Sequence, residues 1–140
     1  MNAQDSDELN PSPEGELSLQ FPALPSDTNG FGDIYGGWLV AKMDLAASIH
    51  AGKLAHSRIA TVSISQVDFM SPVLVGTLLS FYTRVVETGN SSMKIVAEVW
   101  AQCPDGSEFR KITEGLFVLV AIDENGRIRP LPQQNRRLRS

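Results

Sequence analysis

Residues 36–54, GGWLVAKMDLAASIHAGKL, constrain the fold of this chain more than any other segment. Between Trp38 and Ala51 the only formal charges are those of Lys42 and Asp44. A helix that is apolar almost all round is a buried one. The segment therefore predicts one long central helix, with the remaining elements packed around it.

Strand-like segments lie on both sides of this predicted helix. One covers residues 16–21, and four more follow at 60–69, 76–86, 93–99 and 109–122, joined by short turns. Within 60–69 the apolar residues change from even to odd positions, which indicates a β-bulge. We expect an α+β fold in which an antiparallel five-stranded sheet wraps around one helix. A single copy would leave an apolar sheet edge exposed, so we also expect a dimer.

The length of 140 residues fits one domain, which we place at residues 16–132. Residues 1–15 are rich in proline, serine and acids and are predicted to form a disordered tail, and residues 133–140 a basic, flexible one. The net charge of −4 argues against nucleic-acid binding. No apolar run is long enough for a membrane helix, and the N-terminus does not resemble a signal peptide. We expect a cytoplasmic protein.

Metal and thiol chemistry find little support in the sequence. The single cysteine, Cys103, excludes an internal disulfide and a cysteine-based zinc site. The two histidines, His50 and His56, belong to no cluster of metal ligands. We therefore expect neither a metal nor a cofactor.

Asp44 is the strongest candidate for a catalytic residue. A carboxylate in the middle of a buried helix is costly unless it is paired or functional. Lys42 points to a different side of the helix, because residues two apart do not meet. The sequence alone leaves two interpretations open: a functional carboxylate, and a structural one that is hydrogen-bonded to a neighbouring group.

The start of the helix offers a second chemical feature. Helix N-termini present free N–H groups, and glycines at 36 and 37 would let a carbonyl oxygen approach those of Gly36 and Gly37. A tight turn into a closely packed helix explains the same glycine pair equally well. Asn29, in the long loop before the helix, can hold a water or an acyl group, or can simply form an Asx-turn.

Taken together, these segments resemble the YciA-type bacterial acyl-CoA thioesterases, members of the hotdog-fold acyl-CoA hydrolase family. The resemblance covers roughly residues 17–132. It is carried by the segments 25–29, 32–38, 43–44, 68–73, 91–94, 98–100 and 117–123.

This resemblance implies hydrolysis of acyl-CoA to a free acid and CoA at active sites in a homodimer interface, with dimers assembling into hexamers as trimers of dimers. It implies that Asp44 is the general base or the nucleophile and that Asn29 orients the water or the substrate. It further implies that the amides of Gly36 and Gly37 form the oxyanion hole. CoA itself would be substrate and product, with a role in lipid metabolism.

The resemblance also implies residues that bind the substrate. Tyr35 stands where relatives commonly carry phenylalanine and is expected to line the acyl channel, with Thr28 nearby. The turn after the third strand is expected near the nucleotide, although Asn90 replaces the arginine of many relatives. The predicted substrate- and CoA-binding residues are thus Thr28, Tyr35, Arg58, Gly89, Asn90, Ser91, Ser92 and Lys94.

Two other functions stay open on the sequence. A hydratase or dehydratase of the hotdog fold would use a histidine with a carboxylate, but residues 22–35 contain no histidine. A non-catalytic acyl-CoA-binding protein would be expected to have lost the carboxylate, which Asp44 retains.

Overall fold

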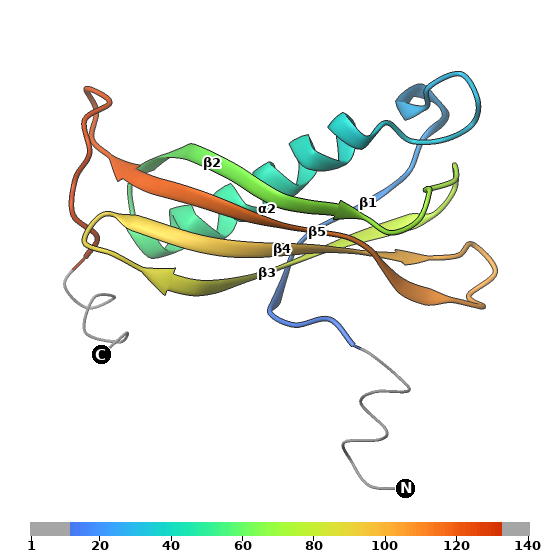
Figure 1. Ribbon diagram of the computed structural model, residues 1–140. Helices are drawn as coiled ribbons and strands as arrows, with labels where there is room; N and C mark the ends of the chain where they lie inside the picture. Colours follow the sequence, from blue (N-terminus) through green and yellow to red (C-terminus); the bar gives the residue numbers. More distant parts are fainter. Residues whose placement is uncertain (1–11, 133–140) are drawn as a thin grey trace, which may run out of the picture.

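The computed structural model describes residues 12–132 and consists of one curved antiparallel sheet and one long helix. Its elements are β1 (Glu16–Pro22), the 3-10 helix η1 (Pro25–Asp27), α2 (Gly36–Ala55), β2 (Arg58–Phe69), β3 (Leu78–Thr88), β4 (Ser92–Gln102) and β5 (Phe109–Ile122). The strand order is β1-β3-β4-β5-β2, and the sheet curves around α2 (Figure 1). The predicted fold is confirmed. Residues 1–11 and 133–140, which hold most of the two predicted tails, lie outside the described residues.

The core lies between the concave face of the sheet and one face of α2. Met93, Ile95, Ala97 and Val99 alternate along β4 and are all fully buried, as their spacing predicts. Met43 of α2 is equally buried against the sheet. Truncating a core residue such as Met43 to alanine costs roughly 2–5 kcal/mol in proteins generally.

The predicted bulge in β2 is confirmed by its pairing with β5. The register shifts between Thr61 and Ser63 and again between Ser65 and Asp68. Gln66 has a positive φ of 52°, which a non-glycine residue rarely adopts. β2 forms one edge of the sheet, and two of its apolar side chains are exposed, Val62 by 59% and Ile64 by 43%.

The prediction that α2 is buried almost all round is wrong for a single chain. The sheet covers only one side of the helix, so Leu45 and Ile49 are 44% and 37% exposed. These residues and the exposed apolar residues of β2 are available for the dimer contact that the sequence predicts.

Two connections fix where α2 begins. The amide of Ala23 donates to the carbonyl of Thr77 at 2.8 Å, and the amide of Ile34 donates to the carbonyl of Val73 at 3.1 Å. The long loop between β1 and α2 is thereby bound to the segment between β2 and β3. Both segments lie at the end of the sheet where α2 starts (Figure 1).

The residues just before β1 cross to the outer face of the sheet. Gly15 has a φ of +101°, and a Cβ there would lie 2.3 Å from the carbonyl oxygen of Thr83, so only glycine fits. The carboxylate of Glu14 then lies 3.4 Å from the guanidinium of Arg84. Glu14 and Gly15, which belong to the predicted N-terminal tail, thus contact β3.

Candidate active site

The first turn of α2 presents accessible backbone amides. The first hydrogen bond within the helix runs from the amide of Leu39 to the carbonyl of Tyr35 at 3.2 Å. The amides of Gly36 and Gly37 precede that bond, and Tyr35 at the N-cap forms no side-chain hydrogen bond to them. Both glycines are exposed. Such amides, at the positive end of a helix, are suited to stabilise a developing oxyanion.

The two glycines meet different surroundings. A Cβ on Gly36 would lie 3.3 Å from the ring of Phe69, whereas a Cβ on Gly37 would meet nothing within 4 Å. The close packing predicted for the glycine pair therefore applies to Gly36 alone. At Gly37, the space that a Cβ would occupy is open.

A hollow of about 320 Å³ adjoins this helix start. Gly36 and Leu39 of α2 line one side of it, and Phe69 and Met70 at the end of β2 line another. A substrate group held at the Gly36 amide therefore has room beside it.

Asp44 lies in the middle of α2 and is only partly buried. The hydroxyl of Thr61, on β2, donates a 2.6 Å hydrogen bond to Oδ1 of the Asp44 carboxylate. This bond fixes one oxygen and leaves the second oxygen for another partner. The arrangement satisfies both interpretations of Asp44 that the sequence left open, since a held carboxylate can be structural and can also act as a base.

The helix start and Asp44 are too far apart to act on the same bond within one chain. Eight residues separate Gly36 from Asp44, which corresponds to about 12 Å along a helix. A reacting carbonyl has to lie within about 3–3.5 Å of its catalytic groups. One chain therefore supplies two half-sites, the amides at the helix start and the Asp44 carboxylate. Each half-site lacks the catalytic group that the other provides.

Asn29 forms the Asx-turn that the sequence allowed. Its side-chain oxygen accepts a 2.9 Å hydrogen bond from the amide of Phe31. The backbone amide of Asn29 donates to the carbonyl of Asp33 at 2.8 Å. No contact joins Asn29 to Asp44 among the hydrogen bonds of the described residues.

The predicted substrate-binding residues fall at two opposite ends of the sheet (Figure 1). Thr28 and Tyr35 lie in the loop at the start of α2, where Tyr35 is 55% exposed and the hydroxyl of Thr28 donates to the carbonyl of Pro25 at 3.0 Å. The predicted residues 89–92 form the turn between β3 and β4 at the other end. The structure thus does not bring the two groups together within one chain.

The basic residues predicted at that second end already have partners. Arg58 donates to the carbonyl of Glu124 at 3.1 Å. Lys94 lies 2.9 Å from the carboxylate of Glu87. In the turn itself, a Cβ on Gly89 would lie 2.6 Å from Oγ of Ser92. The backbone carbonyl of Ser91 accepts a hydrogen bond from the amide of Ala121, and that of Asn90 accepts one from the amide of Leu131. These contacts build the turn.

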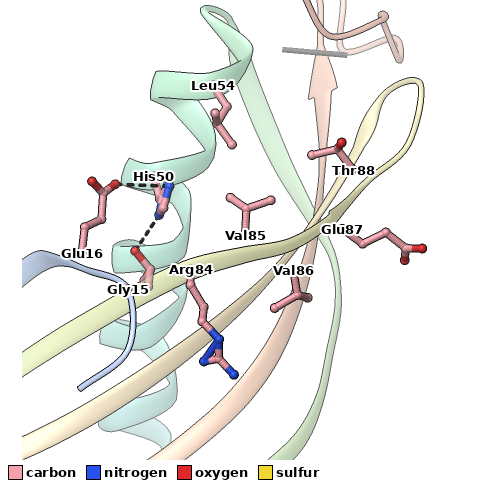
Figure 2. A pocket seen from close by; sticks show the side chains of 10 residues that line it. Gly15, Glu16, His50, Leu54, Arg84, Val85, Val86, Glu87 and Thr88 are labelled. Carbon is pink, nitrogen blue, oxygen red and sulfur yellow. Dashed lines mark hydrogen bonds and ion pairs between the residues drawn. The ribbon is translucent and has the colours of Figure 1, made fainter. Parts of the chain in front are cut away.

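A histidine–carboxylate pair joins His50 of α2 to Glu16 at the start of β1 (Figure 2). Nε2 of His50 is 3.2 Å from Glu16, and Nδ1 of His50 is 2.8 Å from the hydroxyl of Thr83. Burial lowers the pKa of His50 below its ordinary value of 6.5, against the opposing effect of Glu16. The pair lines a cavity of about 600 Å³ between α2 and the end of β3. It lies 14 residues, or roughly 21 Å, from the first amide of the helix, so the N-terminus of its own helix does not reach it.

Sequence reasoning did not single out Thr61 and Phe69. Threonine is common in β-strands, and only the pairing of β2 with β5 in the folded sheet brings the hydroxyl of Thr61 to Asp44. Phe69 is a further apolar residue of the same strand until the fold places its ring over Gly36. Neither residue carries a local signal that could have identified it.

Two kinds of feature, a cluster of metal ligands and a membrane-spanning helix, are absent from the described residues. Within residues 12–132, no three His, Cys, Asp or Glu side chains are grouped so as to hold a metal ion. In the same part of the chain, no helix has both the length and the apolar character needed to cross a membrane.

Comparison with known proteins gives close matches over most of the chain. A sequence profile described as the Thioesterase superfamily matches residues 31–105. The acyl-CoA thioester hydrolase YciA of Salmonella typhimurium is 45% identical over 127 residues, which cover 88% of this chain and 95% of that protein.

Solved structures agree with these sequence matches. The hexameric thioesterase of Yersinia pestis superposes with a TM-score of 0.84 at 42% identity, covering 87% of this chain and 99% of that one. A hexameric hotdog fold thioesterase of Campylobacter jejuni superposes with a TM-score of 0.83 at 36% identity, covering 89% and 96% of the two chains.

Proposed function

The chain belongs to the Thioesterase superfamily, and from that premise we propose that it hydrolyses the thioester of acyl-CoA to a free acid and CoA. The observation that carries the proposal is the Asp44 carboxylate, held by Thr61 at 2.6 Å on a partly buried helix face. A general base needs this combination of a fixed orientation and an available oxygen. The identity to a named acyl-CoA thioester hydrolase supports the choice of substrate.

The reaction can proceed through Asp44 in two ways. As a general base, the carboxylate takes a proton from water, the hydroxide adds to the thioester carbonyl, and the tetrahedral intermediate expels the CoA thiolate, which is then protonated. As a nucleophile, the carboxylate forms a mixed anhydride and releases the thiolate, and water then hydrolyses the anhydride. In either route the negative oxygen of the intermediate is stabilised by the amides of Gly36 and Gly37.

We assign these groups to a site shared by two copies of the chain. The separation of about 12 Å between Gly36 and Asp44 in one helix requires that a second copy supplies one of them. Two helices related by a two-fold axis can bring the start of one beside the middle of the other. The exposed Leu45 on α2 and Val62 on the β2 edge supply apolar surface for that contact. Asn29 would orient the water from its loop, next to the helix start.

We further propose that three such dimers form a hexamer. Two of the solved relatives are hexameric thioesterases. A trimer of dimers would give each active site the two copies that the separation of Gly36 and Asp44 calls for. Its test is the mass of the full chain in solution, measured by light scattering, where a mass of one or two chains would contradict it.

The activity is tested by following the loss of thioester absorbance with acyl-CoAs of short, medium and long chains. The full chain should hydrolyse at least one of them, and Asp44→Ala should be slower by roughly a hundredfold or more. Measurable acyl-CoA binding without hydrolysis at any chain length would reject the proposal and leave a non-catalytic acyl-CoA-binding protein.

The shared site is tested by co-producing Asp44→Ala with Asn29→Ala. If the two residues act from different copies, mixed dimers contain one intact site, and random pairing restores about a quarter of the sites. If both act from one copy, no intact site forms. Each variant alone serves as the control, and activity no higher than that of the variants alone would contradict the shared site.

A further inference from the structure

The cavity beside His50 lies against a part of β3 that β1 leaves uncovered. β1 pairs with β3 only at residues 78–83, and β4 occupies the opposite edge of β3 along its whole length. Within residues 12–132, no strand pairs with residues 84–87 on the β1 side, and these four residues line the cavity (Figure 2). Such an open edge presents N–H and C=O groups that readily accept a further strand.

The cavity adds an apolar floor to this edge. Leu54 of α2 and Val85 of β3 lie in the space between the helix and the strand (Figure 2). Val86 also lines the cavity and is 49% exposed. An open strand edge beside an apolar pocket suits an extended segment, because the edge supplies backbone hydrogen bonds and the pocket holds a side chain.

The described part of the chain ends beside the same edge. The amide of Leu131 donates to the carbonyl of Asn90 at 2.8 Å, and the Leu131 side chain is only 2% exposed. Asn90 belongs to the turn directly after β3 and lies two residues beyond Thr88, which lines the cavity. Residues 133–140 therefore begin close to one end of the open edge.

The number of residues that follow Pro132 matches the length of the edge. A segment that leaves Asn90 and follows β3 back towards Arg84 runs antiparallel to β3, in the same direction as β1. Six residues separate Asn90 from Arg84, which corresponds to about 20 Å along a strand. The eight residues 133–140 span up to about 26–29 Å when extended. They are therefore long enough to reach the point where β1 begins.

The sequence of this segment, QQNRRLRS, places one apolar side chain at the level of the cavity. Leu138 lies six residues beyond Pro132, and Val85 lies five residues before Asn90. An antiparallel segment therefore brings Leu138 to the level of Val85. There its side chain can pack between Val85 and Leu54, where it removes apolar surface from water.

The charges of the segment agree with this placement. Neighbouring residues of a strand point to opposite faces, so Leu138 over the cavity puts Arg137 and Arg139 on the outer face of the sheet. Glu87 lies on that face, because it pairs with Lys94, which alternates with inward-facing residues of β4. The carboxylate of Glu87 is 62% exposed and lies 2.9 Å from Lys94. An arginine can share this carboxylate, because exposed ion pairs contribute little.

The other end of the chain does not suit the edge. Ser12 lies at the cavity on the outer face of the sheet that Arg110 and Lys111 also line. Residues 1–11 carry three acids and no basic residue. Beside Glu16 and Glu87 they would place like charges next to one another, which is destabilising in a sheet.

We propose that residues 133–140 of the same chain add to the open edge of β3 as a short antiparallel strand, with Leu138 in the cavity between Leu54 and Val85. This strand lies end to end with β1 and covers the part of the edge that β1 leaves open. The sequence predicts a flexible tail here, and the proposal gives the segment a fixed place instead. The inference does not rest on the proposed function.

Hydrogen–deuterium exchange of the full chain, followed by mass spectrometry of the peptides from β3, tests this strand. Leu138→Asp puts a charge into the cavity, so the edge amides of residues 84–87 should exchange roughly tenfold faster than in the natural chain. A chain that ends at Pro132 should show the same increase. Peptides from β4 should not change in either variant, which excludes general unfolding.

Ile128→Asp is the matched control for Leu138→Asp. Ile128 is 67% exposed, precedes the segment and does not line the cavity. Its replacement introduces the same charge in place of an apolar side chain, and it should leave the exchange of residues 84–87 unchanged.

Three results would overturn the proposal. Equal exchange of residues 84–87 in the natural chain, in Leu138→Asp and in the shortened chain would show that the segment does not lie on this edge. Exchange that slows with rising protein concentration but ignores Leu138→Asp would show that a second copy covers the edge through other residues. Exchange that depends on both concentration and Leu138 would assign the segment to another copy.

Discussion

The hydroxyl of Thr61 donates a 2.6 Å hydrogen bond to the carboxylate of Asp44, joining the edge strand β2 to the central helix. The bond depends on the pairing of β2 with β5, because Thr61 lies opposite Leu119, which is fully buried on the face of the sheet that packs against α2. The position of β2 in the sheet therefore sets the orientation of the residue to which we assign the chemistry.

Replacing the hydroxyl of Thr61 should weaken catalysis without unfolding the protein. Thr61→Val keeps the shape but removes the donor, and we expect kcat to fall by roughly tenfold or more, as for loss of one hydrogen bond to a charged group. Thr61→Ser retains a hydroxyl and should restore most of the rate. Steady-state kinetics test this, and equal rates for the valine and serine variants would show that the bond has only a structural role.

The contact between Gly36 and Phe69 predicts a rescue experiment. A Cβ on Gly36 would press on the Phe69 ring at 3.3 Å and push it into the hollow beside the helix start. Because that ring is 52% exposed and can shift, and because alanine favours the helix over glycine, the free energy of unfolding of Gly36→Ala should change by no more than about 1 kcal/mol. The kcat/KM of Gly36→Ala should fall by a larger factor than its stability loss explains. Adding Phe69→Leu should recover part of the lost kcat/KM. A double variant no more active than Gly36→Ala would contradict this account.

His50 predicts how stability changes with pH. Burial lowers its pKa in the folded state, so the unfolded chain takes up the proton at a higher pH. The contribution of neutral, buried His50 to the free energy of unfolding is fully present above about pH 6.5. It is lost as the pH falls through the pKa of the histidine in the unfolded chain and then through its lower pKa in the folded chain. The groups facing His50 are Glu16 on β1, Thr83 on β3 and Lys53 on α2.

The measurement is thermal unfolding of the full chain and of His50→Gln at pH 7.5 and pH 5. The natural chain should lose more stability between the two pH values than the variant, which has no imidazole to protonate. Equal losses in both proteins would mean that burial of His50 does not contribute to the pH dependence.

Glu98 predicts a stability loss on the outer face. Glu98→Ala would leave the indole N–H of Trp100 without its 2.8 Å partner and Arg84 without its buried carboxylate. Removing one member of a buried ion pair costs about 3–5 kcal/mol. Denaturant unfolding of the full chain tests this, with Glu87→Ala as the exposed control. A loss below about 1 kcal/mol would indicate that water replaces the carboxylate.

Much of the fold followed from the sequence because its patterns are local. The apolar helix and the strict alternation of residues 93–99 predicted α2 and β4, and the parity change in residues 60–69 predicted the bulge. What the sequence could not specify are contacts between distant segments. Asp44 was identified from its position in an apolar helix, whereas its partner Thr61 lies 17 residues further along and depends on the fold.

The predicted burial of α2 and the predicted substrate residues illustrate the same limit. The helix is apolar on a side that the sheet of one chain does not cover, so its composition reflects more than this chain's own core. The predicted CoA residues separate into two ends of the sheet, and their joint role depends on how copies assemble. The roles of the site residues, the cytoplasmic location and the tails outside residues 12–132 stay predictions.

The most direct test of the central claim is the kcat of Asp44→Asn for acyl-CoA hydrolysis. Asparagine keeps the size of the side chain and can still accept the Thr61 hydrogen bond, but it cannot take a proton from water or form an anhydride. Loss of thioester absorbance avoids reagents that react with Cys103, and Asp105→Asn, in an exposed turn, serves as the matched control. We expect kcat to fall by roughly 10²–10⁴ with an unchanged fold and a similar KM. A folded Asp44→Asn variant that hydrolyses acyl-CoA as fast as the natural chain would contradict the account.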